Sequence, residues 1–408
     1  MISLDEARRR VLDACERVHP KAMPLSAALV GCVTSVPIEA PEAVPPFDNT
    51  AVDGYAVRAV DTEGASGTGA VELVVLGTVA AGMEPPAAPL GTGQTWRIMT
   101  GAPMPAGADA VVMVEDTDGG TEVVRITKAV NSGDSVRGTG DDVKPGDIVF
   151  DRFTELRPAH LGVLASLGYR KAPVFPKLKV GVLSTGDELV DDGSVLKPGQ
   201  IREANRPMLL GLVEQAGAIG VDLGIARDTD EDITAAIERG LGECDALVTS
   251  GGVSMGAFDY IKVVLDRLSG NAMSWMQIAI KPAKPFSFGM IGGKPVFGLP
   301  GNPVSSLVSF ELLARPALRQ MMGHQGAALD RPTVNAVADD GLRRRPDGKT
   351  HFVRVFGHWG DDGRLHVTST GPQGSHQLAA TALANALAEL PDGDGIVPGG
   401  VVSVRMLS

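Results

Sequence analysis

Three apolar segments that each run into a glycine-containing loop dominate the middle of the chain, and helical segments alternate with them. The apolar segments are KVGVLSTGDEL (179–189), DALVTSGGVSMG (245–256) and PVFGLPGNP (295–303). The helical segments include NRPMLLGLVEQAG (205–217) and DEDITAAIERGL (230–241). Strands that alternate with helices form βαβ units, so residues 176–325 are predicted to form a parallel sheet covered by helices on both faces.

A β-rich block is predicted before this region. Residues 27–150 contain short alternating segments between Gly, Pro and Asp turns, namely VELVVLGTVAAG (71–82), WRIMTG (96–101), DAVVMVED (109–116) and EVVRITKAV (122–130). One helix precedes the block, with a capping-box pattern at Ser3 and Glu6, and another, RPAHLGVLASLGY (157–169), follows it. We therefore expect an inserted domain, with residues 1–26 and 151–175 forming a composite helical region.

The last part of the chain, residues 332–408, is predicted to form a small β-barrel, interrupted by an alanine-rich helix near 376–388. The expected fold class is thus α/β plus β in a multi-domain chain.

The net charge of −12 argues against binding to nucleic acid or to an anionic membrane surface. The three scattered cysteines and the absence of a signal peptide or a long apolar run favour a soluble protein of the reducing cytoplasm.

The loops that follow the three apolar segments are candidates for binding an oxyanion such as phosphate. Ligands of an open parallel sheet bind at the carboxyl ends of its strands, where backbone N–H groups and hydroxyls converge. Each loop alone could equally be a tight turn or a helix cap. Three of them in one sheet favour a ligand, and the candidate residues are Ser184, Thr185, Gly186, Ser250, Gly251, Gly252, Ser254, Pro300, Asn302 and Pro303.

Charged residues accompany these loops. Carboxylates next to a bound phosphate require an intervening cation, and Mg²⁺ commonly takes one or two carboxylates together with phosphate oxygens. The candidates are Asp187, Glu188, Asp228 and Asp259, and for each of them a helix cap or a solvated charge is the alternative. Two lysines, Lys281 and Lys284 in IKPAKPFSFG, are each followed by proline; a bound anion and two ordinary surface lysines are equally good explanations of them.

Seven segments, in this order, resemble the MoeA family of molybdopterin molybdenumtransferases, which is related to plant and animal E domains such as that of gephyrin. They are DNTAVDGYAVR, RIMTGAPMPAGADAVVMVED, GVLSTGDEL, PGQIREANRPML, TSGGVSMG, IKPAKPFSFG and LPGNPVSS. The resemblance runs from about residue 5 to the C-terminal barrel. The sequence departs from the family's usual residues at Val52, Phe258, Ala283 and His376.

The resemblance implies an elongated homodimer whose α/β domain is of the MogA type. It also implies an enzyme that inserts molybdate into adenylylated molybdopterin with Mg²⁺ and releases AMP, downstream of a molybdopterin adenylyltransferase. Asp187, Glu188 and Asp259 would then hold Mg²⁺, with Asp228 next to them. The residues that would bind molybdate are Lys281, Lys284, Ser305, Arg354 and Ser375.

The segment PPFDNTAVDGYAVR (45–58) has two interpretations. Taken alone, Asp53 and Gly54 are typical of a hairpin turn. The resemblance instead implies that Asp53, with Thr100 nearby, is supplied to the active site of the other subunit.

Two other functions are compatible with parts of the sequence. The α/β domain could itself adenylylate molybdopterin, although the related adenylylating proteins carry a TTGGTG-like loop where this chain has TSGGVS. A scaffold without catalytic activity is the other alternative, but it does not account for the acidic and basic site residues. Molybdate and tungstate are not distinguished by the sequence.

Overall fold

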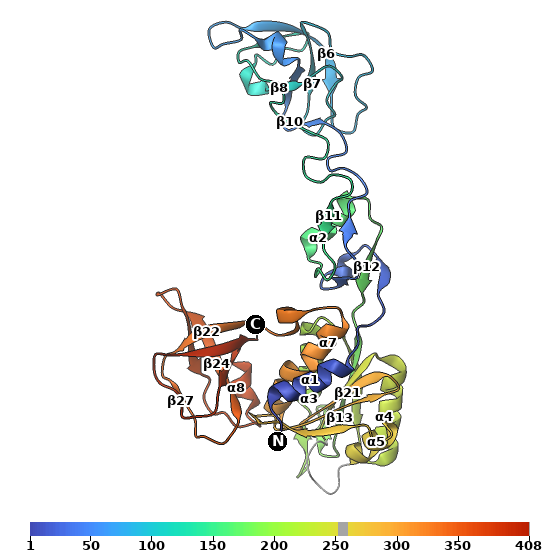
Figure 1. Cartoon of the computed structure of the whole chain (residues 1–408), viewed down its shortest axis with the longest axis vertical. Helices are drawn as coiled ribbons and strands as arrows, with labels where there is room; N and C mark the ends of the chain where they lie inside the picture. The colour runs from blue at the N-terminus through green and yellow to red at the C-terminus, as the bar shows by residue number, and fades with distance from the viewer. Residues whose placement is uncertain (252–259, 408) are drawn as a thin grey trace. The chain divides into compact units, whose positions relative to one another are not determined.

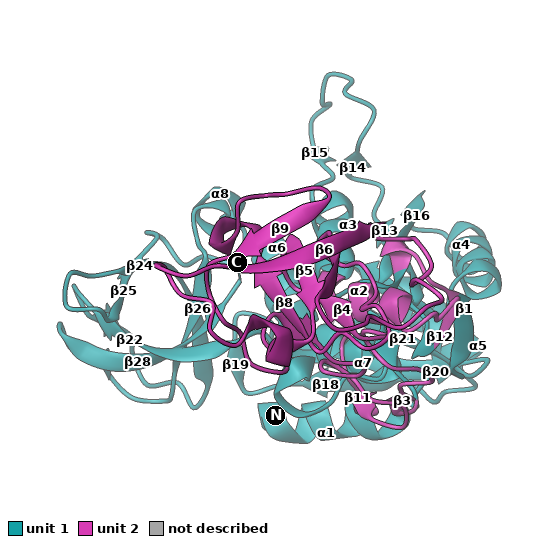
Figure 2. Ribbon diagram, turned by 90° about the horizontal axis from the view of Figure 1, so that it is seen from above, with its two compact units in different colours: residues 1–23, 29–35, 173–408 teal, residues 24–28, 36–172 magenta. Residues whose placement is uncertain are grey.

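The computed structural model describes residues 1–251 and 260–407. The chain has two compact units (Figure 2). The first unit comprises residues 1–23, 29–35 and 173–408, and the second comprises residues 24–28 and 36–172. The second unit is therefore inserted into the first, as predicted.

A six-stranded sheet with the order β16-β13-β17-β21-β20-β18 forms the centre of the first unit. Its strands are β13 (Lys179–Thr185), β16 (Ile219–Ala226), β17 (Ala246–Ser250), β18 (Ser274–Gln277), β20 (Pro285–Ile291) and β21 (Lys294–Leu299). Strands β16, β13, β17 and β21 pair in parallel, which confirms the predicted α/β fold. The antiparallel pairs β21–β20 and β20–β18 at one edge were not predicted.

Helices cover both faces of this sheet (Figure 1). Helices α1 (Leu4–Ala14), α3 (Asn205–Gln215), α6 (Pro303–Ser309) and α7 (Arg315–Met321) pack on one face, and α4 (Asp230–Glu243) and α5 (Tyr260–Leu268) on the other. Successive side chains of a strand point to opposite faces. Accordingly, Val182 of β13 belongs to the core under α3, and Leu183 belongs to the core under α4.

The predicted start of the first helix is only half correct. The Ser3 hydroxyl accepts a hydrogen bond from the Glu6 backbone N–H at 3.1 Å, which caps α1. The Glu6 carboxylate, however, pairs with Arg9 and Arg10 rather than returning to the backbone of Ser3. Ion pairs along the helix surface therefore replace the second half of the capping box.

The inserted unit contains a five-stranded sheet with the order β8-β5-β7-β6-β9. Its strands are β5 (Gly54–Val57), β6 (Val71–Val79), β7 (Gln94–Ile98), β8 (Ala110–Met113) and β9 (Val123–Ile126). The unit also contains β3 (Ile38–Glu39), β4 (Asn49–Thr50), β10 (Val136–Arg137), β11 (Ile148–Phe150) and α2 (Pro158–Ser166). Strand β4 pairs with β10, whereas β5 pairs with β7 and β8, so residues 45–58 do not form a hairpin.

A closed barrel forms the end of the chain, as predicted. Its strands are β22 (Thr333–Ala338), β24 (Thr350–Trp359), β25 (Leu365–Ser369), β26 (Ala386–Leu390) and β28 (Gly400–Met406). The order β24-β25-β22-β28-β26 closes through a β24–β26 pairing, and β19 (Ile280–Lys281) adds to β24. The prediction of a helix near 376–388 is wrong in length, because the observed helix is shorter. Helix α8 covers only Leu378–Ala382, because the following residues form β26 and close the barrel.

The remaining strands pair in small sheets of two or three strands. They are β1 (Lys21–Pro24), β2 (Val33–Thr34), β12 (Lys171–Phe175), β14 (Leu189–Val190), β15 (Ile201–Arg202), β23 (Leu342–Arg343) and β27 (Gly395–Ile396). No helix among residues 1–251 and 260–407 has both the length and the apolar character needed to cross a bilayer. Helix α1 packs with the α/β core, and α2 lies in the inserted unit. The predicted division into a composite helical region, an inserted domain, an α/β domain and a barrel stays a prediction in its exact bounds.

Candidate functional site

The three loops singled out in the sequence meet at the carboxyl ends of β13, β17 and β21. They line a cavity of about 270 Å³, which we call the sheet-end cavity. The residues that line it are Ser184, Thr185, Glu188, Leu189, Ile201, Arg202, Glu203, Ala204, Asn205, Ser250, Gly251, Gly301, Asn302, Pro303 and His376. The crevice forms here because β13 and β21 lead to helices on one face of the sheet and β17 leads to a helix on the other.

Most of the predicted loop residues belong to this cavity. Gly186 and Pro300 lie next to lining residues in the sequence but do not line it themselves. Gly252, Ser254 and Asp259 lie outside the described residues. The structure thus brings together one loop from each of three strands, which sequence spacing alone could not establish.

Gly251 is required by the packing of two strand ends. Its φ angle is +104°, and a Cβ atom would lie 2.9 Å from the Thr185 carbonyl oxygen. Its backbone N–H donates to the Leu299 carbonyl at 3.2 Å. This N–H is therefore used inside the protein, and the side-chain hydroxyls are the donors that the described part of the loop offers to a ligand.

Three acidic residues gather at the same end of the sheet. The Asp228 backbone N–H donates to Asp187 Oδ1 at 3.2 Å. Burial, followed by the negative charges of Asp187 and Glu188, raises the pKa of Asp228. No ion pair within residues 1–251 and 260–407 neutralises these carboxylates, and the same residues contain no cluster of three or more metal-ligating side chains.

Arg354, on strand β24, is a fully buried cation. Its Nη2 donates to the carbonyls of Pro372 at 2.7 Å and Gly374 at 3.3 Å. Among the described residues, its Nε and Nη1 have no hydrogen-bond partner, and no carboxylate forms an ion pair with it. Burial lowers the pKa of Arg354, because a charge without a counter-ion is poorly stabilised away from water.

The other predicted anion-binding residues lie on segments that adjoin Arg354. Lys281 lines a second cavity of about 620 Å³ together with Gln373 and Gly374 of the loop that Arg354 contacts. In the same loop, the Ser375 carbonyl accepts a hydrogen bond from the Val304 N–H at 3.1 Å. That bond ties the loop to the start of α6.

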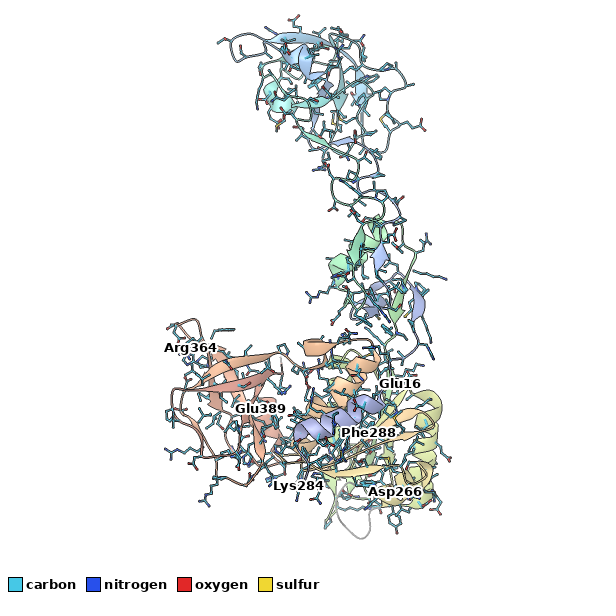
Figure 3. All side chains as sticks on the ribbon, viewed as in Figure 1. Glu16, Asp266, Lys284, Phe288, Arg364 and Glu389 are labelled. Carbon is cyan, nitrogen blue, oxygen red and sulfur yellow. The ribbon has the colours of Figure 1, made fainter. Side chains whose placement is uncertain are left out.

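Ser305 and Lys284 complete this set. Ser305 is the buried neighbour of Val304 on α6. Lys284 is exposed on the segment that leads from barrel strand β19 to sheet strand β20 (Figure 3). Loop 372–376 thus connects both cavities, since His376 lines the sheet-end cavity and Gln373 lines the second one.

Asp53 and Thr100 are brought together in the inserted unit. Thr100 donates to Asp53 Oδ1 from its backbone N–H and from its hydroxyl, both at 2.7 Å. These two hydrogen bonds lower the pKa of Asp53, which is therefore a carboxylate near neutral pH. Both side chains are exposed within their unit.

Sequence reasoning missed several residues at these cavities. Glu203 and Asn205 line the sheet-end cavity, and their motif, REANRP, had been assigned no role. Arg343, Arg344 and Arg345 line the second cavity, where the run of three arginines was an available signal.

Three regions of the chain match known domains. Residues 2–168 match the MoeA N-terminal region (domain I and II), residues 181–320 a probable molybdopterin binding domain, and residues 336–407 the MoeA C-terminal region (domain IV). The fold is thus that of a MoeA-type protein.

Full-length relatives agree with this assignment. The chain is 39% identical over 403 residues to molybdopterin molybdenumtransferase 2 of Mycobacterium tuberculosis, with 96% of each protein covered. It is 37% identical over 404 residues to the molybdopterin molybdenumtransferase of Haemophilus influenzae, covering 98% of this chain and 97% of the relative. The crystal structure of a molybdopterin biosynthesis MoeA protein from Pyrococcus horikoshii superposes with a TM-score of 0.82 at 33% identity, covering 100% and 99% of the two chains. The chain therefore belongs to the MoeA family of molybdopterin molybdenumtransferases and is a transferase of molybdenum cofactor biosynthesis.

Proposed function

We propose that this chain transfers molybdate to adenylylated molybdopterin and releases AMP together with the finished molybdenum cofactor. The observation that carries the proposal is the guanidinium of Arg354, which is fully buried and has two nitrogen atoms without a partner in the described structure. A buried cation with unused N–H groups is stabilised by a bound anion. Molybdate, a tetrahedral dianion, offers oxygens that accept such hydrogen bonds.

The neighbouring residues support an oxyanion pocket made of Lys281, Lys284, Ser305, Arg354 and Ser375. Two ammonium groups and two hydroxyls supply donors in addition to the guanidinium. Because loop 372–376 borders both cavities, an anion held by this pocket lies next to a substrate in the sheet-end cavity. The protein then acts by positioning and electrostatics, without a covalent enzyme intermediate.

The acidic residues at the sheet end are the candidates for holding Mg²⁺, and because the described residues alone form no cluster of three metal ligands, Asp259 belongs to the set. Asp187, Glu188 and Asp228 repel one another and have no cationic partner among the described residues, and a divalent cation removes this repulsion. We assign these carboxylates, with Asp259, to holding the ion. When bound, Mg²⁺ neutralises phosphate charge and assists the departure of AMP.

We further propose that the active protein is a cytoplasmic homodimer. Asp53, held by Thr100, is supplied by the partner subunit to the site described above. The substrate comes from an upstream enzyme that adenylylates molybdopterin. Hydrogen bonds that keep Asp53 ionised support a role for it as a carboxylate rather than as an acid.

Incubation with adenylylated molybdopterin, Mg²⁺ and molybdate tests the proposal. We expect AMP to be released and a cofactor-free molybdoenzyme to become active. Omitting molybdate or chelating Mg²⁺ should prevent activation. Consumption of ATP with free molybdopterin, without an upstream enzyme, would instead indicate an adenylyltransferase, and the absence of any turnover would favour a scaffold.

A further inference from the structure

Two buried side chains, Asn205 and Glu203, contact the serines of the sheet-end cavity. Asn205 is 9% exposed, and its Nδ2 donates to Ser250 Oγ and to the Gly301 carbonyl, both at 2.7 Å. The Glu203 side chain is 2% exposed, and its Oε1 accepts a hydrogen bond from Ser184 Oγ at 3.0 Å. Each side chain therefore contacts a hydroxyl on a different strand end.

The orientation of the Asn205 amide follows from its two contacts. If the amide were turned over, its oxygen would lie 2.7 Å from the Gly301 carbonyl oxygen, and two acceptors would face each other. The NH₂ group must therefore face Gly301 and Ser250. The Ser250 hydroxyl accepts from it, and its own hydrogen finds no acceptor in the described part of the chain.

Glu203 has the opposite effect on Ser184. A carboxylate can only accept, so the Ser184 hydroxyl must donate its single hydrogen to Glu203. Glu203 is itself held in place, because Oε1 also accepts from the Arg206 backbone N–H at 2.8 Å and Oε2 lies 3.6 Å from Arg206 Nε. Only the lone pairs of Ser184 remain for a ligand.

We propose that Asn205 and Glu203 are positioning residues that give the two serines opposite hydrogen-bonding roles towards the substrate. Ser250 donates to an anionic oxygen of the substrate's phosphate, and Ser184 accepts from an N–H or O–H group elsewhere on the substrate. The phosphate belongs at Ser250 because the Ser250 hydroxyl keeps a hydrogen to donate to an anionic oxygen, whereas Ser184 offers only lone pairs. This inference rests on the proposed function, which places a nucleotide phosphate in the sheet-end cavity.

Calorimetric titration of the full-length protein with AMP and with adenosine, in the presence of Mg²⁺, tests the proposal. The two ligands differ only in the phosphate, so the ratio of their affinities isolates the phosphate contact. In Ser250→Ala this ratio should fall by about tenfold, since a hydrogen bond to a charged group is lost. Asn205→Leu, which is uncharged and of similar size, should lower the ratio in the same direction and have no further effect when combined with Ser250→Ala.

Glu203→Gln is the matched control. It alters the partner of Ser184 but not that of Ser250, so the affinity ratio should stay within about twofold of the wild-type value. Thermal unfolding of each variant separates a folding defect from a binding defect. If Asn205→Leu does not fold, the affinity ratios of Ser250→Ala and Glu203→Gln test the proposal.

Three results would overturn the inference: additive effects of the Asn205 and Ser250 substitutions, equal losses for AMP and adenosine, or a lowered ratio in Glu203→Gln. A wild-type protein that binds AMP no better than adenosine would also overturn it. The molybdate-dependent activation assay decides the proposed function independently of all these outcomes.

Discussion

Arg354 lies in surroundings that differ from those of Arg344, another arginine of the C-terminal region. Arg344, whose side chain is 2% exposed, pairs with Asp347 at 2.9 Å and Asp392 at 2.6 Å. Arg354 is more deeply buried and has only two carbonyl groups as partners. A buried guanidinium without a carboxylate partner lowers the stability of the fold. Such a cost is expected where a residue binds a ligand.

This contrast predicts opposite effects of the same substitution on stability. Arg354→Met should leave the protein as stable as the wild type or stabilise it by about 1–2 kcal/mol, because it removes an unpaired buried charge. Arg344→Met should destabilise it by about 2 kcal/mol, because Asp392 loses its cationic partner and the carbonyls of Lys349, Leu390 and Pro391 lose a hydrogen-bond donor. Urea unfolding measures both, and a large loss of stability in Arg354→Met would mean that Arg354 is a structural residue.

For single residues, the sequence indicates which side chains lie at the site better than it indicates which side chains contact one another. Ser184, Ser250 and Asn302 were singled out from strand–loop spacing, and the structure brings them to one cavity. Asn205 was not, because its bond to Ser250 spans 45 positions of sequence and its bond to Gly301 spans 96. Such contacts depend on which strands are neighbours, and local spacing carries no information about that.

At the scale of elements, two glycines of α4 show how closely this helix approaches the sheet. A Cβ atom at Gly240 would lie 2.6 Å from Leu223 Cδ1 and 2.8 Å from Leu247 Cδ2. A Cβ atom at Gly242, in the same helix, would meet nothing within 4 Å.

Alanine should therefore have opposite effects at the two positions. Gly242→Ala should stabilise the protein by up to about 1 kcal/mol, because alanine favours the helix. Gly240→Ala should destabilise it by about 1 kcal/mol or more, because overpacking of the core outweighs the same helical gain. Thermal unfolding of the two variants checks this, and equal shifts would show that α4 is free to move away from the sheet.

The barrel shows where helix propensity misled the sequence analysis. Residues 376–388 are rich in alanine and leucine, which favour helices. Yet Ala386–Leu390 pairs with β24 on one side and β28 on the other. Closing the barrel satisfies the backbone groups of both neighbours, and this tertiary pairing overrides the local preference.

A histidine between two aspartates predicts a pH dependence of barrel stability. His366 Nδ1 lies 2.6 Å from Asp339 Oδ1, and its Nε2 lies 3.1 Å from Asp362 Oδ1. These contacts raise the pKa of His366. A raised pKa stabilises the fold fully at pH values below the ordinary histidine pKa of about 6.5, and the contribution disappears as the pH rises through the raised value.

His366→Gln should therefore lower the unfolding temperature at about pH 6 and have little effect at about pH 9. The His366 pKa itself can be followed by NMR. A larger loss at the higher pH, or a pKa below the ordinary value, would contradict this assignment.

At the scale of the whole molecule, the sequence predicted the fold class but not the path of the chain. Short strands between turns indicate the inserted part and the C-terminal barrel. Strands that alternate with helices indicate the α/β part. The structure places residues 29–35 in the first unit, between two segments of the inserted one. Such an excursion of a few residues has no signature in composition or periodicity.

A shared active site predicts that two impaired variants restore each other. Asp53→Asn and Arg354→Met chains, when co-expressed, should form mixed dimers with one intact site, and about a quarter of wild-type activity should return for random pairing. Each variant alone should have little activity at a molybdate concentration that saturates the wild type but lies far below the half-saturating value of Arg354→Met. A mixture that stays inactive although mixed dimers form would show that Asp53 does not serve the partner's site.

The molybdate dependence of cofactor formation tests the central claim most directly. The rate is measured against molybdate concentration for the wild type and for Arg354→Met, at a fixed saturating concentration of adenylylated molybdopterin. Loss of two charged hydrogen bonds should raise the half-saturating molybdate concentration by about 100-fold or more, while the apparent affinity for adenylylated molybdopterin stays within about threefold. An unchanged molybdate dependence in Arg354→Met would contradict the assignment of the buried guanidinium to the oxyanion.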